Sequence, residues 1–331
     1  MQRKRFLITG GAGYVGSHAV LALADRGDEV TILDDLSLGH ADAVPDGVRL
    51  IEGSLADIAL VDRVLADGPW EGVMHFASLS LVGESMARPM HYLIENAGLG
   101  MRLIDSCVRH AVPRFVLSST AALFGRPGLE PITEAALVDP GSPYGESKAM
   151  LERTLLWADR IHGLRYACLR YFNAAGCDAA GRAGEDHTPE THLIPLVIDA
   201  ALGRRPELVV FGDDYDTPDG TCIRDYVHVA DLASAHLLAL EQLDGGSVTY
   251  NLGNGSGHSV LEVIRSVERV SGLPVPFRIA ERRPGDPPRL VASSEKLKRE
   301  TGWTPKFPEL DDIIATAFAW REARPHGYGN R

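Results

Sequence analysis

The chain has 331 residues, which is enough for two domains or for one large domain with a substantial buried core. Its formal net charge is −12, from 33 Lys and Arg against 45 Asp and Glu, so we do not expect a protein that coats nucleic-acid phosphates. The hydrophobic content of 45% and the charged content of 24% are typical of a water-soluble globular protein, and no apolar run approaches the ~18 residues of a membrane span.

The first half of the chain alternates short β-branched or apolar runs with longer segments of helical periodicity, which is typical of βαβ units. We expect strands at Arg5–Thr9, Glu29–Asp34, Val48–Glu52, Gly72–Phe76, Arg114–Ser118 and Arg165–Tyr171. Helices are expected near Tyr14–Arg26, Asp57–Ala66, Met90–His110 and Tyr144–His162. The predicted fold class is therefore α/β, with a Rossmann-type doubly wound parallel sheet.

After about Asn173 the pattern changes, because Gly-, Pro- and Asp-rich stretches at 176–191, 212–220 and 281–288 separate shorter elements. In this half we expect strands at Val248–Leu252 and Pro276–Ile279 and helices at Val260–Ser271 and Leu310–Arg321. Long loops in a compact fold are commonly binding elements. The second half is therefore predicted to bind the substrate.

The cysteines and the N-terminal residues indicate the compartment. Cys107, Cys168, Cys177 and Cys222 show neither metal-ligand nor CxxC spacing, and the first residues show no apolar signal segment. We expect a cytoplasmic protein with no metal site and with no membrane or nucleic-acid partner.

A glycine-rich turn directly follows the first predicted strand. Gly10, Gly13 and Gly16 form G-x-x-G-x-x-G before a helical stripe, where backbone N–H groups can approach a pyrophosphate at the positive end of the helix. Asp34, at the end of the second strand, would bind the adenosine ribose hydroxyls and repel a 2′-phosphate, so NAD is favoured over NADP. Asp35 is either a second ribose contact or a solvated loop carboxylate. A tight turn without a ligand is the alternative reading of the glycines.

A second motif indicates redox chemistry. Tyr144 and Lys148 are four residues apart on one predicted helix face. For tyrosine to act as a base at neutral pH its pKa must fall by about 3 units, worth roughly 4 kcal/mol, which the lysine and a nicotinamide charge could supply together. Thr120 follows the strand Arg114–Ser118 at the ligand-binding edge, although a strand-end cap is the simpler role for it. Taken alone, the spacing of Tyr144 and Lys148 is more typical of an exposed helix face, and Thr120 is more typical of a strand-end cap. Their occurrence together with the glycine motif predicts a nicotinamide enzyme.

Longer motifs carry a resemblance to a known family. They are GGAGYVGSH, HFASLSLVGES, SSTAALFG, SPYGESK, RYFNAAG, ETHLIP, VFGDDYDTPDGTCIRDYVHVADLA and RRPGDPP. Over Phe6 to Trp303 the chain resembles the extended short-chain dehydrogenase/reductase family and, within it, the UDP-glucose 4-epimerases. The resemblance implies an NAD-binding Rossmann domain at 1–173 and a mainly UDP-sugar-binding domain at 174–331, some segments of which return to the Rossmann sheet.

The resemblance also implies roles for individual residues. The catalytic residues would be Thr120, Tyr144 and Lys148. The residues that would bind NAD are Gly10, Gly13, Tyr14, Val15, Gly16, Asp34, Asp35, Phe76, Ala77, Ser118, Tyr144, Lys148 and Tyr171. Those that would bind the UDP-sugar are Thr120, Tyr144, Asn173, His192, Leu193, Arg224, Arg283, Asp286 and Leu290, with Tyr171 also near the substrate.

Several of these assignments have alternatives. Arg224 and Arg283 would hold the diphosphate and Asp286 the uridine ribose, but Arg282 could do the same task, and either arginine could be a surface ion pair. His192 is a ligand contact or a loop-to-helix cap. Leu290 either limits the space at the sugar C2 substituent or is a core leucine.

The implied reaction is 4-epimerisation of a UDP-sugar by transient oxidation. Tyr144 takes the proton of the 4-hydroxyl as the C4 hydride passes to NAD, the 4-keto sugar turns while the UDP stays anchored, and the hydride returns to the opposite face. Thr120 would steady the 4-oxygen, and Lys148 would lower the pKa of Tyr144. UDP-glucose and UDP-galactose are the expected pair; N-acetylhexosamine, xylose/arabinose and uronic acid forms are the alternatives.

Two other functions fit the sequence less well. A 4,6-dehydratase needs a carboxylate beside the catalytic threonine, where this chain has Ala121 and Ala122. A non-catalytic NAD-binding sensor is the remote alternative.

The family implies a homodimer through Met90–His110 and Tyr144–His162. An apolar stripe of Leu93, Ala97, Met101 and Ile104 supports it, unless that stripe faces the sheet.

Three positions depart from the family pattern. Ser54 stands where an aspartate commonly reaches the adenine, Ser80 replaces a lysine that some members direct at the cofactor, and Glu95 replaces the first of two asparagines, leaving Asn96. Cofactor binding is therefore expected to depend more on Asp34, Lys148 and the glycine turn.

Overall fold

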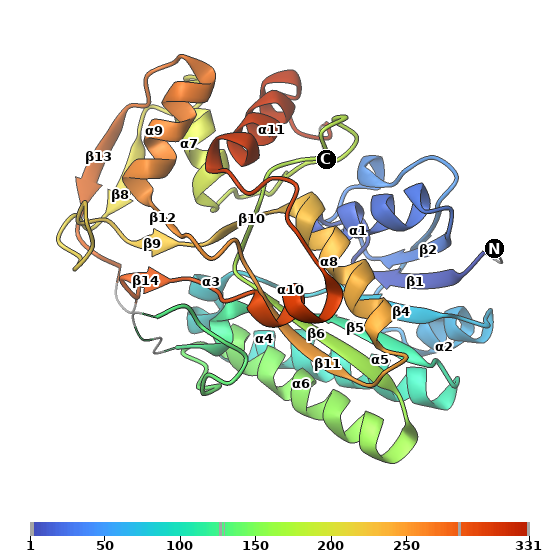
Figure 1. The fold of residues 1–331 in the computed structure, drawn as a ribbon. Helices are drawn as coiled ribbons and strands as arrows, with labels where there is room; N and C mark the ends of the chain where they lie inside the picture. The colour runs from blue at the N-terminus through green and yellow to red at the C-terminus, as the bar shows by residue number, and fades with distance from the viewer. Residues whose placement is uncertain (1–2, 126–127, 129, 284–285, 330–331) are drawn as a thin grey trace.

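A seven-stranded parallel sheet forms the centre of the computed structural model, which describes residues 3–125, 128, 130–283 and 286–329 (Figure 1). The strand order is β3-β2-β1-β4-β5-β6-β11, and every neighbouring pair is parallel. The strands are β1 Arg5–Thr9, β2 Glu29–Asp34, β3 Arg49–Glu52, β4 Gly72–His75, β5 Arg114–Ser118, β6 Arg165–Tyr171 and β11 Val248–Leu252. The predicted Rossmann-type α/β fold is confirmed, and each of these strands lies within one residue of its predicted bounds.

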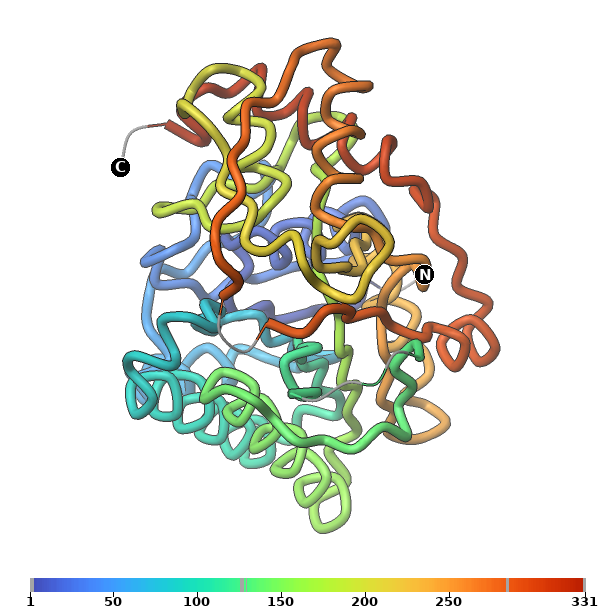
Figure 2. The backbone as a smooth tube through the Cα atoms, turned by 90° about the vertical axis from the view of Figure 1, so that its left-hand side faces the viewer, coloured from blue at the N-terminus to red at the C-terminus, as the bar shows by residue number. Residues whose placement is uncertain are grey.

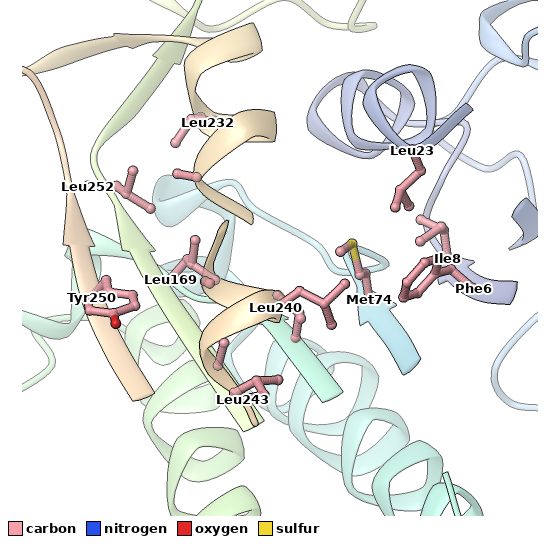
Figure 3. Packing of buried hydrophobic residues seen from close by; sticks show 14 of the residues in the cluster. Phe6, Ile8, Leu23, Met74, Leu169, Leu232, Leu240, Leu243, Tyr250 and Leu252 are labelled. Atoms are coloured by element: carbon pink, nitrogen blue, oxygen red, sulfur yellow. The ribbon is translucent and has the colours of Figure 1, made fainter. Parts of the chain in front are cut away.

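Alternate side chains of the strands point to opposite faces of the sheet, and each face is covered by helices. Phe6 and Ile8 of β1 pack with α1 Tyr14–Asp25, α8 Val229–Gln242 and α10 Glu295–Thr301, whereas Leu7 faces α2 Ile58–Ala66, α5 Leu99–Arg109 and α6 Pro143–His162. Figure 3 shows the first of these cores, in which Leu232, Leu240 and Leu243 of the α8 region pack over the sheet. Although α8, α10 and β11 lie late in the chain, they belong to this layered body.

The predicted helix Met90–His110 is divided. It consists of α4 Pro89–Tyr92, a π-helical turn η2 Leu93–Gly98, and α5, and it is preceded by α3 Val82–Ala87. Of the two readings of the apolar stripe, the structure favours the one in which it faces the sheet, because Ala97 and Ile104 are buried at 3% and 2% exposure and Met101 packs against the same core as Ile104. The stripe thus faces the body of the molecule, as amphipathic helices over a sheet do.

A smaller lobe stands over the edge where the strands of the sheet end (Figures 1 and 2). Its helices are α7 Leu193–Ala201, α9 Val260–Ser271 and α11 Leu310–Ala323, which share one hydrophobic core. Its strands form three small sheets: β7 Asn173–Ala175 with β10 Tyr226–His228, β8 Leu208–Phe211 with β13 Phe277–Ala280, and β9 Ile223–Arg224 between β12 His258–Ser259 and β14 Arg289–Leu290. Short 3₁₀ turns lie at Ala41–Ala43 and Ala121–Leu123.

The second half was predicted less completely than the first. Strand β13 begins one residue later than expected, and α11 continues two residues further. Helices α7 and α8 and strands β8 and β10 were not predicted by range. The expected loops at 176–191 and 212–220 are irregular in the structure; in the expected loop 281–288, residues 284–285 lie outside the described residues. The domain boundary at residue 173 stays a prediction. In the described part of the chain, every helix is too short or too polar to cross a bilayer.

Candidate active site

The glycine-rich turn joins β1 to α1 at the centre of the sheet edge. Gly10 has a φ of +74°, and a Cβ there would lie 2.3 Å from the backbone N of Ala77. A Cβ on Gly16 would lie 2.1 Å from the carbonyl O of Gly10. Both positions therefore require glycine, and the first-turn amides of Tyr14, Val15 and Gly16 have no preceding helical carbonyls to bind. Gly13 is the N-cap of α1, and Gly13, Tyr14 and Val15 are partly exposed.

Asp34 ends β2 beside this turn. Its Oδ2 accepts a hydrogen bond from the amide of Ala12 at 2.9 Å, and its Oδ1 accepts one from Leu36 at 2.9 Å. Burial raises the pKa of Asp34, and these two amides act in the opposite direction. A carboxylate has about four acceptor positions, so two are left for ribose hydroxyls. Asp35 is exposed and accepts hydrogen bonds from the backbone and side chain of Ser37.

Tyr144 and Thr120 meet at the carboxyl edge of β5. Tyr144 is in the first turn of α6, which Ser142 caps by accepting a hydrogen bond from Gly145. Burial raises the pKa of Tyr144, and a hydrogen bond with Thr120 lowers it. Thr120 also accepts a hydrogen bond from the amide of Ala122 at 3.1 Å, so its capping role and its contact with Tyr144 coexist.

Lys148 lies one turn further along α6 and is fully buried. Its Nζ donates to the carbonyl O of Ser118 and to Oγ of Ser78, each at 2.8 Å. Burial lowers the pKa of Lys148 to about 7. The amine is thus held at the edge of β5 by two oxygens, next to the strand end where Ser118 Oγ meets the Tyr171 hydroxyl at 2.5 Å.

Two rings adjoin this group. Burial raises the pKa of Tyr171, and the neighbouring Tyr144 raises it further. His75, at the end of β4, was not predicted as part of the site: its Nδ1 shares a hydrogen bond of 2.8 Å with Thr9 Oγ1, and burial together with the charge of Lys148 lowers its pKa to about 3. His75 is therefore a neutral ring within the electrostatic reach of Lys148. Phe76 and Ala77 follow it, partly buried, against Gly10.

A buried ion pair that sequence reasoning missed supports the Thr120 strand end. Arg170 Nη2 lies 2.5 Å from Glu152 Oε2, and Glu152 Oε1 accepts a hydrogen bond from Ser119 at 2.6 Å. The side chains of Arg170 and Glu152 are 9% and 11% exposed. This pair links β6, α6 and the residue before Thr120. Its only sequence signal is an arginine that directly follows the apolar residues Ala167–Leu169 of the strand.

The three departures from the family pattern lie on three separate segments: Ser54 follows β3, Ser80 lies between β4 and α3, and Glu95 is in η2. Ser80 and Glu95 are exposed, and Ser54 accepts a hydrogen bond from the amide of Ala56. The remaining Asn96 is 1% exposed; its amide bonds both backbone groups of Leu79 and donates to Ser147 Oγ. Asn96 thereby fixes the loop that carries Ser78, the partner of Lys148.

In the lobe, Arg224 and Arg283, which were predicted to bind the diphosphate, both contact Asp286, which was predicted to bind the uridine ribose. Arg224 Nη2 is 2.8 Å from Asp286 Oδ1, and Arg283 Nη2 is 3.0 Å from Asp286 Oδ2. Arg224 is 14% exposed, whereas Arg283 is 60% exposed. Arg282 turns away, stacks over Tyr215 at 4.2 Å and pairs with Asp214, so it does not share this position.

Asn173 and Leu290 are brought beside Arg224 by the lobe's backbone. Asn173 donates from both its amides to the carbonyl O of Asp225, and Leu290 of β14 is the register partner of Arg224. Asp225 was not predicted: it is fully buried, and three amides, from Asn254, Gly255 and Ala292, donate to its carboxylate. Leu290 is partly buried against the cluster that contains Ala121.

His192 does not cap α7 with its side chain. It is the N-cap residue, but its Nδ1 lies 2.5 Å from Glu185 Oε1 instead. Leu193 follows as the first residue of α7 and is partly buried.

Comparison with known proteins identifies the family. A family model described as "NAD dependent epimerase/dehydratase family" matches residues 6–253. A UDP-glucose 4-epimerase of Halalkalibacterium halodurans is 49% identical over 97% of this chain and 97% of its own length. A crystal structure of a UDP-glucose 4-epimerase superposes with a TM-score of 0.96 at 46% identity, covering 99% of this chain and 100% of that one. The UDP-glucose 4-epimerase of Bifidobacterium longum, solved with NAD+ and UDP, gives a TM-score of 0.92 at 36% identity, covering 98% and 100%.

These matches span both the sheet and the lobe, and they confirm the resemblance inferred from the motifs. The chain therefore belongs to the NAD dependent epimerase/dehydratase family.

Proposed function

We propose that the chain interconverts UDP-sugars that differ in configuration at C4, with UDP-glucose and UDP-galactose as the principal pair. The reaction class is an NAD-dependent isomerisation, which rests on the family and on relatives that carry this name over nearly the full chain. The roles proposed for individual residues rest on one observation: Tyr144, Thr120 and Lys148 lie together at the carboxyl edge of β5, beside the glycine turn.

The glycine turn and Asp34 fit the cofactor. Because a Cβ at Gly10 or Gly16 would overlap the chain's own backbone, only glycine allows this tight turn, which leaves the first amides of α1 available to a pyrophosphate. In this proposal Gly13, Tyr14 and Val15 bind the pyrophosphate with Gly10 and Gly16. Asp34, assisted by Asp35, binds the adenosine ribose. Phe76, Ala77, Ser118 and Tyr171 line the nicotinamide side together with Tyr144 and Lys148.

Bound NAD supplies a reversible acceptor for the hydrogen on C4 of the sugar. Tyr144 moves the proton of the 4-hydroxyl, and Thr120 holds the same oxygen through its hydroxyl. In the cofactor-free protein burial works against this step, because it raises the pKa of Tyr144 and lowers that of Lys148. The positively charged nicotinamide ring of bound NAD would favour the phenolate.

The lobe anchors the UDP moiety. Arg224 and Arg283 converge on one carboxylate, Asp286, and a diphosphate would replace that carboxylate as their anionic partner. Asp286 is then available for the uridine ribose. Asn173, Leu193 and His192 lie on the segments that lead from β7 to α7, and in this proposal they contact the sugar diphosphate.

Leu290 is proposed to limit the space at the sugar C2 substituent. It packs against the cluster that includes Ala121, the residue after Thr120, and is next to Arg224 in the register of β14 and β9. A leucine leaves more room than a tyrosine, so some activity on N-acetyl forms is expected. UDP-xylose/arabinose and UDP-uronic acids are the alternative substrates.

We further propose a homodimer. The outer faces of η2, α4 and α6 expose apolar side chains: Met90 at 62%, Ile94 at 56%, Trp157 at 59% and Ile161 at 66%. Exposed large apolar groups on neighbouring helices favour a protein partner. Light scattering at micromolar concentration should give twice the chain mass, and Trp157→Lys should give a monomer, while Leu137→Lys, at an exposed leucine elsewhere, should not. A monomeric wild-type protein would contradict the proposal.

The activity is tested by incubating the purified protein with UDP-galactose without added NAD. We expect UDP-glucose to form until equilibrium, because the cofactor stays bound and is regenerated. Bound NAD without turnover would contradict the proposal and favour a sensor. A panel of the four substrate pairs then assigns specificity, and a higher kcat/KM for any other pair would overturn the choice of UDP-glucose and UDP-galactose.

A further inference from the structure

Four side chains of the segment between β7 and α7 form a compact group. Glu185, His187, Glu190 and His192 occur within eight positions, and one ligating atom from each lies within 4.8 Å of all the others. We call these residues the Glu/His cluster. It is separate from the group around Tyr144, and no catalytic role has been given to Glu185, His187 or Glu190 above.

The distances between the ligating atoms of the Glu/His cluster are similar to those between ligands of a single bound ion. His192 Nδ1 and His187 Nδ1 lie 2.5 Å and 3.5 Å from Glu185 Oε1, and both lie 3.8 Å from Glu190 Oε1. Ligands bound at ~2.0–2.2 Å to one tetrahedral ion are separated by roughly 3.3–3.6 Å. An ion at the centre therefore requires only small side-chain adjustments.

Two buried polar atoms of the cluster make only long contacts. Among the described residues, His187 Nδ1, 3.5 Å from Glu185 Oε1, and Glu190 Oε2 have no hydrogen bond of good geometry. The Glu190 side chain is 10% exposed; its Oε1 accepts the amides of Thr191 and His192. The nearest cation, Arg321 Nη1, is 3.6 Å from Oε2, and its guanidinium is bound in two places to Asp199. Poorly paired buried polar atoms are costly, so the cluster has capacity for a further cation.

We propose that Glu185, His187, Glu190 and His192 bind one divalent transition-metal ion of the zinc class. Two imidazole nitrogens with two carboxylate oxygens suit Zn²⁺, whereas Mg²⁺ and Ca²⁺ prefer sets made only of oxygen. Two carboxylates with neutral histidines balance the 2+ charge. Because the protein supplies four ligands, the ion has no open position and acts as a structural centre rather than a Lewis acid.

The position of the site explains what such an ion would do. The segment that carries it contacts the cofactor half at several points. Tyr14, in the glycine turn, donates to the carbonyl O of Gly176 at 2.6 Å, His40 Nε2 lies 3.0 Å from the carbonyl O of Asp186, and Arg182 pairs with Asp25 at 2.9 Å. The ring of His187 also packs edge-on against Tyr14 at 6.1 Å. The ion would tie this segment into one unit directly before α7, next to Leu193.

Without an ion, protons hold the cluster together. Although burial opposes it, the neighbouring carboxylates of Glu185 and Glu190 raise the pKa of His187 to about 10. A protonated ion-pair cluster is therefore the competing description. It differs from the metal site in a measurable way, since it takes up no zinc.

The test uses the full chain with its cofactor, treated with a chelator and dialysed. Calorimetric titration with Zn²⁺ should give one site per chain, and Zn²⁺ should raise the unfolding temperature. His187→Gln and Glu190→Gln should each weaken binding by at least about a hundredfold, more than the loss of an outer contact to a ligand. The matched control is His326→Gln, whose histidine is exposed in the same lobe but outside the cluster, and it should bind like wild type.

The proposal fails if the wild-type protein binds no zinc at one site per chain, which would leave the protonated ion-pair cluster as the correct description. It also fails if His187→Gln and Glu190→Gln retain wild-type affinity. The wild-type stoichiometry decides the question even if a variant folds poorly, and the unfolding temperature of each variant without zinc shows whether it is folded.

Discussion

Replacing Lys148 with methionine should separate stability from activity. The amine is fully buried, and its pKa is lowered to about 7 from an ordinary value of 10.5. Between pH 7 and pH 10.5 the unfolded chain binds a proton at this residue that the folded, cofactor-free protein does not. The stability of the folded state therefore rises with pH across this window. At about 1.4 kcal/mol per pH unit, the unfolding free energy rises by ~5 kcal/mol across this window.

Lys148→Met removes this penalty and also two hydrogen bonds, to Ser118 and Ser78. The lost hydrogen bonds cost ~1–3 kcal/mol. At pH 7 the variant is thus expected to be more stable than wild type by ~2–4 kcal/mol, since the first effect is larger. Near pH 10.5 the penalty for burying the charged amine has vanished and only the loss of the two hydrogen bonds remains. The wild type is then expected to be more stable than the variant. Epimerisation is expected to be lost at every pH.

The assay is urea unfolding of cofactor-free wild type and variant at pH 7, 8, 9 and 10, followed by circular dichroism. The difference in unfolding free energy isolates Lys148, because the other titrating groups are common to both proteins. Lys306→Met, at an exposed lysine, is the control and should show no comparable slope. A difference that does not change with pH, or a variant less stable than wild type at pH 7, would refute the reasoning about the buried amine.

Three further substitutions test the site. Tyr144→Phe should lower kcat by about 10²–10⁴ while NAD stays bound, since only the proton-transfer group is lost; near-normal turnover would assign that step to another residue. Glu152→Gln leaves the Arg170 charge buried without its partner and should cost ~3–5 kcal/mol of unfolding free energy, against little change for the exposed Glu146→Gln. Leu290→Tyr should reduce kcat/KM for the N-acetyl substrate roughly ten- to two-hundred-fold more than for UDP-galactose, and equal losses would mean that Leu290 serves packing alone.

The strands and helices of the first half could be predicted because period-2 and period-3.6 patterns alternate there with clear turns. Helix α8 was missed although Leu232, Ala235 and Ala239 recur at helical spacing, since its small alanines give a weak stripe. The π-helical turn at Leu93–Gly98 has no pattern of its own, so a continuous helix was expected.

At the site, spacing alone places only residues that are near in sequence, and distant residues are assigned only through the family resemblance. The spacing of Tyr144 and Lys148 fixes one helix face, and that placement needs no tertiary information. Arg224 and Asp286 are 62 positions apart, and their contact depends on the pairing of β9 with β14. The burial that lowers the pKa of Lys148 likewise arises only when β5 and α6 pack together.

The most direct measurement of the central claim follows the hydrogen on C4. UDP-galactose deuterated at C4 is converted by the enzyme in ordinary water, and the UDP-glucose formed is analysed by mass spectrometry and NMR. If the enzyme takes this hydrogen to its bound cofactor and returns it to the other face, while Tyr144 moves only the hydroxyl proton, the product keeps the deuterium at C4. Loss of the deuterium to solvent would contradict the account.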